Sequence, residues 1–138
     1  MARLPNVEAH TPGVDADLVR AVQQRRGGDL LNLDRMLLHS APLARGWNAY
    51  MGAVRTGCAL AGDLRELVIL QVAVLNRAPY EFAQHVPVAL AAGLSQAKID
   101  AIAQWQASTL FEERERDVLA YGEAMTLKVQ VDEATFQA

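Results

Sequence analysis

The sequence predicts an all-α fold, and three observations support this prediction. Apolar residues recur at spacings of three and four along most of the chain, which is the period of one helical face. Residues that often begin helices, such as Asp, Ser and Pro, precede these segments, and glycines follow several of them. No segment is predicted as a strand. We therefore expect six to seven helices.

Composition narrows the class of protein. A chain of 138 residues with 51% apolar and 21% charged residues is expected to fold as one soluble domain around one core. A net charge of −3 and 6% aromatic residues argue against a nucleic-acid-binding protein, and the apolar runs are too short to span a membrane. The N-terminus lacks a secretory signal and Cys58 is the only cysteine, so a cytoplasmic location is expected.

The N-terminal part is expected to hold an arm and three helical segments. Residues 1–14 contain two prolines and no apolar periodicity, which predicts an extended arm that is ordered when it docks, often on a neighbouring subunit. Asp15 is the expected N-cap of a short helix. One or two helical turns follow within residues 32–39, and Pro42 lies at the start of a helix that stops near Gly57.

The central stretch of the chain, residues 66–85, is almost uninterrupted in its apolar character as far as Asn76. It opens on Glu66 and closes on His85. By propensity alone this run could equally be a buried strand, because many of its residues are β-branched. A helix is favoured because the segment that Asp63 is expected to cap is longer than most strands and has helical neighbours.

The remaining helices follow in order. Pro79 is expected to start a helix, Pro87 to kink it or force a restart, and Gly93 to end it. Ser95 is the expected N-cap of the next helix, and residues 109–112 fit a capping box ahead of a long helix. A last short element is expected close to the end of the chain.

The polar residues around the central stretch are the candidates for chemistry. Glu81 and His85 stand one helical turn apart on the same face. A tight turn at residues 76–79 would make an antiparallel helix hairpin, in which the buried Glu66 can approach the imidazole of His85. We expect this hairpin to hold the functional site.

These residues resemble the signature of the carboxymuconolactone decarboxylase family, which also contains the alkyl hydroperoxidase D-like proteins. That signature is a Glu, eleven intervening residues, Cys-x-x-Cys, and a His four residues after the second Cys. Glu66 and His85 match it, whereas Ala78 and Glu81 stand where the cysteines would be. The chain looks like the decarboxylase-type branch, which lacks the redox cysteines.

The resemblance covers roughly residues 35–138. It implies an alkyl hydroperoxidase D-like helical bundle around a central helix hairpin, here a single domain over residues 15–138. Family members usually continue past the position of Ala138 with a further helix. We therefore expect either a truncated form or cover from a partner subunit, with an exposed apolar face at that end.

The resemblance implies a cofactor-free lyase that decarboxylates a small carboxylated lactone or a related acid. His85 would be the general acid or base, and Glu66 would orient its ring and set its tautomer. Glu81 could be the proton relay instead. No cofactor and no metal are expected, because two ligands on one helix and a distant Glu66 fall short of a three-ligand site.

Four further residues are expected to bind the substrate: His39, Trp47, Arg77 and Tyr80. An arginine would hold the substrate carboxylate, with Arg77 or Arg45 as candidates. The expected partners are a small carboxylate or lactone and further copies of the chain, as a dimer, trimer or hexamer. No nucleic acid and no membrane are expected to bind.

Two other functions stay open. An alkyl hydroperoxidase or peroxiredoxin-type antioxidant activity needs a thiolate and a resolving thiol, and neither stands at the signature. Cys58 is expected to pack as a small apolar residue. The second alternative is a non-catalytic, oligomeric binding module, in which Glu66 and His85 form a buried hydrogen-bonded pair.

Overall fold

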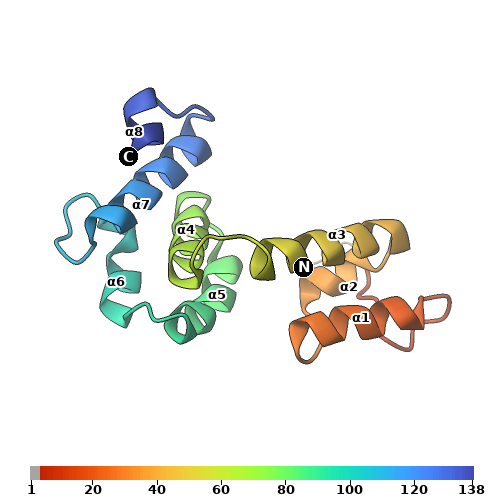
Figure 1. Ribbon diagram of the computed structural model, residues 1–138. Coiled ribbons are helices and arrows are strands. Elements are labelled where there is room, and N and C mark those ends of the chain that lie inside the picture. Colours follow the sequence, from red (N-terminus) through yellow and green to blue (C-terminus); the bar gives the residue numbers. More distant parts are fainter. Residues whose placement is uncertain (1–3) are drawn as a thin grey trace. The chain divides into compact units, whose positions relative to one another are not determined.

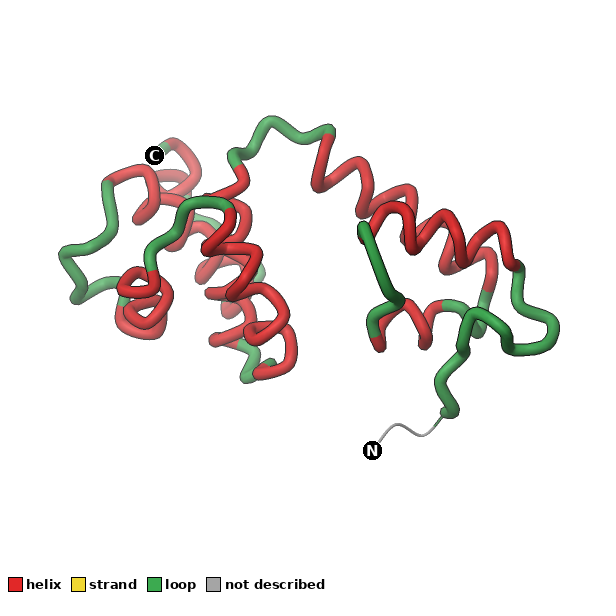
Figure 2. The backbone as a smooth tube through the Cα atoms, turned by 90° about the horizontal axis from the view of Figure 1, so that it is seen from below, coloured by secondary structure: helices red, strands yellow, loops and turns green. Residues whose placement is uncertain are grey.

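The protein is described by a computed structural model over residues 4–138, and its regular structure in this range is entirely helical, as predicted. Loops, with no strand among these residues, join the helices (Figure 2). None of the helices within this range combines the length and apolar character needed to cross a bilayer. The elements are α1 (Ala16–Arg26), α2 (Asn32–Leu37), α3 (Ala41–Thr56), α4 (Gly62–Leu75), α5 (Pro79–Ala91), α6 (Gln96–Ala101), the 3₁₀ turn η1 (Ile102–Gln104), α7 (Glu113–Leu127) and α8 (Glu133–Gln137) (Figure 1).

The count of eight α-helices in the described residues exceeds the six to seven expected. The helical turns expected within residues 32–39 and the last short element expected near the end of the chain form α2 and α8, which have six and five residues.

The chain forms two compact units, one ending at Ala59 and the other spanning Leu60–Ala138. Instead of the single core expected from the chain length, each unit has its own cluster of buried apolar side chains. Helices pack against helices of the same unit: α1 and α2 contact α3 in the first unit, and α4 contacts α5, η1 and α7 in the second.

In the N-terminal unit the described part of the arm packs on its own chain. Val7 is buried in the apolar cluster of this unit. The carboxylate of Glu8 accepts a hydrogen bond from Arg35 at 3.2 Å, and Nε2 of His39 lies 2.8 Å from the carbonyl oxygen of Pro5. Residues 1–3 lie outside the described residues.

Asp15 is the N-cap of α1, as predicted. Its side chain accepts hydrogen bonds from the backbone N–H groups of Leu18 and Asp17, each at 3.0 Å. The hydrogen bond from Leu18, followed by the ion pair with Arg45 at 2.9 Å, lowers the pKa of Asp15 below its ordinary value. Arg45 is therefore engaged in holding the start of α1.

In the C-terminal unit α4 is the central helix and packs against α5, α7 and η1. Leu67 and Leu70 of α4 are fully buried, which confirms the helical interpretation of the central stretch. The expected cap at Asp63 is wrong. Ala61 is the N-cap residue, so Asp63 already lies in the first turn, where its charge interacts favourably with the positive end of the helix dipole.

The other boundaries in this unit follow the prediction in part. α5 begins at Pro79, and Ser95 caps α6 through a hydrogen bond from the backbone N–H of Lys98 at 3.2 Å. Pro87 lies inside α5 without dividing it. The cap ahead of α7 lies three residues later than predicted, at Glu112. The backbone N–H of Glu112 donates a hydrogen bond to Oε2 of Glu115 at 2.8 Å.

The contact between α4 and α7 depends on Gln71, which is only 1% exposed. Its Nε2 donates a hydrogen bond to the carbonyl oxygen of Leu119 at 2.8 Å. A Cβ atom added at Gly122 would lie only 2.7 Å from the Oε1 of Gln71. A glycine is therefore required at this point of α7, despite the cost of glycine inside a helix.

We predict that Gly122→Ala destabilises the protein by about 1–2 kcal/mol, because displacing the buried amide of Gln71 outweighs the gain of about 1 kcal/mol in helix propensity. The matched control is Gly46→Ala in α3, where a Cβ would meet nothing within 4 Å. That variant should gain about 0.5–1 kcal/mol. Urea unfolding followed by circular dichroism measures both, and a Gly122→Ala protein at least as stable as the wild type would contradict the prediction.

Candidate functional site

The hairpin of α4 and α5 brings Glu66 and His85 together, as predicted from their spacing. Nδ1 of His85 lies 2.6 Å from Oε2 of Glu66. The two residues are 1% and 7% exposed, so the contact is sealed from water. A hydrogen bond with an ionised partner in such surroundings is short and strong. This contact fixes both the orientation and the tautomer of the imidazole.

Glu81 extends this pair to the surface. Its Oε1 lies 3.2 Å from Nε2 of His85, one turn away on α5, and its side chain is 51% exposed. At the other end, Nε of Arg65 lies 3.5 Å from Oε1 of Glu66. In these four side chains nitrogen groups and carboxylates alternate along a line, which we call the Glu66–His85–Glu81 line. It runs from the core of the C-terminal unit to solvent.

The line can hold and move one proton. When both carboxylates are ionised, an imidazolium of His85 donates one N–H to Glu66 and the other to Glu81. When Glu81 carries the proton, the neutral ring keeps its Nδ1–H on Glu66 and accepts at Nε2. A proton can therefore pass between Nε2 and the exposed carboxyl group, while Glu66 stabilises the charged ring. This is the arrangement of a general acid or base with an orienting carboxylate.

A shallow apolar hollow lies beside Glu81. It has a volume of about 260 Å³. The residues that line it are Val68, Ile69, Val72, Ala73, Asn76, Ala78 and Glu81. Glu81 is the only ionisable residue in this lining. A small ligand in this hollow, which we call the Glu81 hollow, would meet the exposed end of the proton line.

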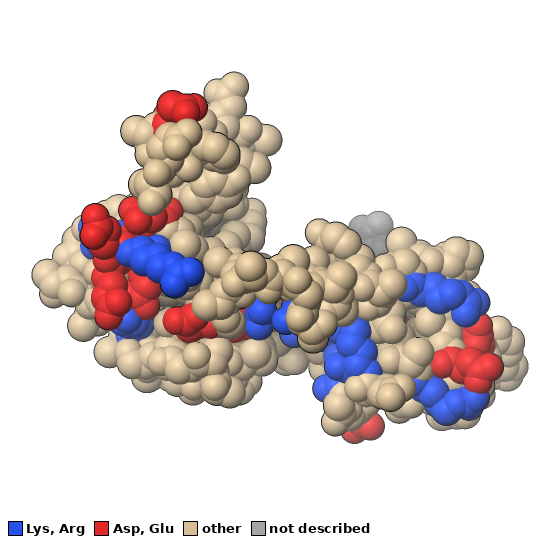
Figure 3. Space-filling model, in the orientation of Figure 1, with Lys and Arg blue, Asp and Glu red and all other residues tan. Residues whose placement is uncertain are grey.

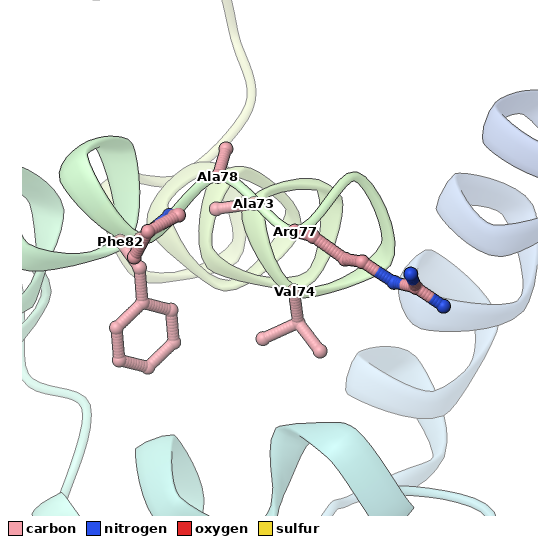
Figure 4. A pocket seen from close by; sticks show the side chains of 6 residues that line it. Ala73, Val74, Arg77, Ala78 and Phe82 are labelled. Atoms are coloured by element: carbon pink, nitrogen blue, oxygen red, sulfur yellow. The ribbon is translucent and has the colours of Figure 1, made fainter.

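A second hollow lies on the other side of the α4–α5 turn, with a volume of about 480 Å³. Its lining residues are Ala73, Val74, Arg77, Ala78, Pro79 and Phe82. Figure 4 shows Val74 and Phe82 pointing to the same side of the turn with a gap between them, and Arg77 extending away from that gap. We call this the Arg77 hollow. Both hollows share the methyl groups of Ala73 and Ala78.

The four predicted substrate-binding residues are divided between the two units. Arg77 is exposed at the Arg77 hollow, and Tyr80 is 49% exposed on the first turn of α5. His39 and Trp47 belong to the N-terminal unit. There His39 contacts Pro5, and Trp47 is half-buried on α3. The structure thus assembles the three predicted catalytic residues and leaves the binding roles of these four as predictions.

The sequence interpretation missed two features of the site. The first is Arg65 beside Glu66, for which the adjacency of a basic and a buried acidic residue was the available signal. The second is the exposure of Val68, Ile69 and Val72, which are half-buried although the central run was expected to have little surface. These side chains form the wall of the Glu81 hollow. Within residues 4–138, no group of three or more His, Cys, Asp or Glu is arranged to hold a metal ion.

Comparison with known proteins agrees with this geometry. The model of the carboxymuconolactone decarboxylase family matches residues 41–124, which is more than half of the chain and includes all of α4 and α5. The chain belongs to the carboxymuconolactone decarboxylase family. A comparison with curated proteins gave no match, and neither did a comparison with solved structures.

The hydrogen bond between Glu66 and His85 should contribute measurably to the free energy of unfolding. We predict that His85→Ala destabilises the protein by about 3 kcal/mol, because it leaves the Glu66 carboxylate buried without its ring partner. Glu66→Gln keeps the shape of the side chain and should cost about 1 kcal/mol.

The double variant should be clearly less destabilised than the sum of the two single variants, with a coupling of about 1–2 kcal/mol. Chemical unfolding of all four proteins at neutral pH measures this coupling. Strictly additive losses would mean that the two side chains do not act as a pair.

Proposed function

We propose that this protein is a cofactor-free lyase that removes a carboxyl group from a small carboxylated lactone or a related acid. Membership of the carboxymuconolactone decarboxylase family supports the class of reaction. The observation that carries the proposal is the Glu66–His85–Glu81 line, because it ends on an exposed carboxyl group beside an apolar hollow. An acid or base that faces an apolar binding site is what such a reaction requires.

The geometry changes the roles expected from the sequence. His85 is only 7% exposed and both of its ring nitrogens face carboxylates. Glu81 has the exposed oxygens and lines the hollow. We therefore propose Glu81 as the residue that exchanges a proton with the substrate, His85 as the residue that supplies or receives that proton, and Glu66 as the residue that orients His85.

The proposed reaction balances without a redox partner. The bond between the substrate carbon and its carboxyl group breaks, and carbon dioxide leaves. The electron pair that remains on the carbon takes a proton from Glu81, which forms the new C–H bond. This proton is the one that Glu81 has received from Nε2 of His85, so the ring is left neutral, and solvent restores one proton to the pair through the exposed carboxyl group. The apolar hollow favours loss of the carboxylate, since a charged group is poorly solvated there.

The hydroperoxidase alternative finds less support. Ala78 and Glu81 occupy the positions of the two signature thiols, and the attack on a peroxide needs a thiolate that a second thiol resolves. Cys58 is exposed, so the expectation that it packs as a small apolar residue is wrong. It belongs to the N-terminal unit, whereas the proton line belongs to the C-terminal unit.

We predict that Glu81→Gln and His85→Ala each lower kcat for decarboxylation of carboxymuconolactone, or of a related lactone acid that the protein turns over, by about 10²–10⁴-fold. Each substitution removes one group of the proton line. Release of carbon dioxide measures the rate. Circular dichroism establishes that each variant is folded under the assay conditions.

The matched control is Glu113→Gln, which neutralises an exposed carboxylate on α7 of the same unit. Its kcat should equal that of the wild type. Turnover that survives both Glu81→Gln and His85→Ala would contradict the acid–base roles. Absence of turnover by the wild type across a panel of carboxylated lactones would favour the binding-module alternative.

We further propose that the protein acts as a homo-oligomer in the cytoplasm, a compartment that suits a chain with a single exposed cysteine. Large exposed apolar side chains occur on the C-terminal half of α7, in the loop that follows it and on α8: Tyr121, Met125, Leu127, Val129 and Phe136. Figure 3 shows that the surface over this region is largely uncharged. An apolar surface of this kind commonly packs against a partner subunit.

Light scattering coupled to size-exclusion chromatography tests the assembly. The wild type should elute as a dimer or larger, and Leu127→Lys combined with Phe136→Lys should shift it toward the monomer because charges at the interface are poorly solvated. The control is Lys substitution at Leu43, an equally exposed apolar residue on α3. A wild type that is monomeric at tens of micromolar would refute the proposal.

A further inference from the structure

Three helices end with the same pair of backbone hydrogen bonds, known as the Schellman motif. In each, the backbone N–H of one residue donates to the carbonyl three residues back, and the N–H of the next residue donates to the carbonyl five residues back. The pairs are Gly27 to Gln24 and Gly28 to Gln23 after α1, Arg77 to Val74 and Ala78 to Ala73 after α4, and Gly93 to Leu90 and Leu94 to Ala89 after α5.

The motif requires a left-handed backbone at its fifth position, where glycine is favoured. Two of the three motifs have glycine there, with φ of 73° at Gly27 and 105° at Gly93. The motif in the functional hairpin has Arg77, with φ of 54°. Within residues 4–138, Val129 is the one other non-glycine residue with positive φ. Arg77 is therefore a strained residue at a position where the same chain twice uses glycine.

The side chain of Arg77 does not repay this strain through contacts within the protein. Its guanidinium makes no hydrogen bond or ion pair with any residue from 4 to 138. Arg77 is one of the residues that line the Arg77 hollow, the others are all apolar, and its side chain extends away from the gap between Val74 and Phe82 (Figure 4). Strain that structure alone does not explain is found most often at functional sites. A free guanidinium beside an apolar hollow is suited to an anion with an apolar body.

The same motif joins the two hollows. Its hydrogen bond from Ala78 to Ala73, at 2.8 Å, brings together the two alanines that line both hollows. No side chain larger than a methyl group separates the hollows at these positions. Glu81 repels an anion on one side of the turn, and Arg77 attracts one on the other. The charges therefore impose a direction on a ligand that lies across the turn.

We infer that Arg77 is a specificity-determining residue that binds the carboxylate of an elongated, apolar-bodied acid. The body of this ligand lies over Ala73 and Ala78 in the Arg77 hollow, and its uncharged end reaches the Glu81 hollow. The inference goes beyond the proposed function, because the carboxylate that Arg77 binds lies away from Glu81 and is not the group that the proposed reaction removes. The hollow of about 480 Å³ is within the range of sites that take ring-sized ligands, and is larger than a small lactone needs.

The test uses three probes of matched shape: 4-phenylbutyrate, its neutral analogue 4-phenyl-1-butanol, and butyrate, which lacks the ring. Calorimetry and NMR chemical shifts measure their binding to the full chain. The wild type should bind 4-phenylbutyrate at least about tenfold more tightly than either of the other probes, because it alone offers both a charge and an apolar body. A wild type without this preference overturns the inference.

Arg77→Gly is the decisive variant. It should bind 4-phenylbutyrate at least about tenfold more weakly and no better than the neutral alcohol. Because glycine relieves the left-handed strain, the midpoint of thermal unfolding should rise by about 2–4 °C. A residue kept for structure would show the opposite result, namely lower stability with unchanged binding, and that result would refute the inference.

Three matched variants complete the experiment. Arg77→Lys keeps the positive charge and should retain most of the preference for 4-phenylbutyrate. Arg114→Gln removes an exposed cation from α7 and should leave binding unchanged, which separates a local contact from net charge. Ala78→Leu places a larger side chain between the hollows and should weaken binding of 4-phenylbutyrate but not of butyrate.

Glu81→Gln separates this inference from the proposed function. It should abolish turnover and retain the preference for 4-phenylbutyrate over its neutral analogue, because Arg77 supplies that preference. Binding that depends on Arg77 without turnover by the wild type would disprove the lyase and retain the ligand site. Turnover that depends on Glu81 with binding unaffected by Arg77→Gly would retain the lyase and disprove the ligand site.

Discussion

The hydrogen bond between Glu66 and His85 is the interaction on which the C-terminal unit depends. An ionised carboxylate that is 1% exposed would cost several kcal/mol without a partner. The ring nitrogen at 2.6 Å offsets this cost, and the guanidinium of Arg65 lies on the other oxygen. Because one partner belongs to α4 and the other to α5, the pair holds the two helices in one alignment. The same contact leaves Nε2 directed toward Glu81.

The position of α4 between several neighbours gives the site its shape. One face of α4 is covered by α5, α7 and η1, and it carries the fully buried leucines Leu67 and Leu70. Val68, Ile69 and Val72 lie on a face that these neighbours cover only in part. Because α4 is apolar on all sides, its neighbours in the unit bury only part of its apolar surface. The uncovered part is the wall against which a ligand can bind.

The turn between α4 and α5 combines structural and functional demands in four residues. Its hydrogen bonds end α4, and Pro79 starts α5 immediately afterwards. The turn also places Ala78, at a signature position of the family, between two hollows. With a methyl group in place of a thiol, this position provides space and not redox chemistry. In the proposed reaction the acid–base chemistry falls to Glu81, which occupies the other signature position.

The sequence by itself determined the features that depend on residues close along the chain. The helical period, the caps at Asp15 and Ser95, and the meeting of Glu66 with His85 follow from local spacing and turn chemistry. These features could be predicted because a helix and a tight turn have nearly fixed geometry.

The tertiary structure alone decided the features that depend on which surfaces meet. Two apolar clusters formed where one was expected, because each unit buries its apolar side chains among its own helices. The half-exposure of the central run, the contact of Arg65 with Glu66, and the left-handed backbone of Arg77 also depend on packing and chain direction beyond any local pattern. Identity and spacing placed the acid–base residues, and packing decided which of them a ligand can reach.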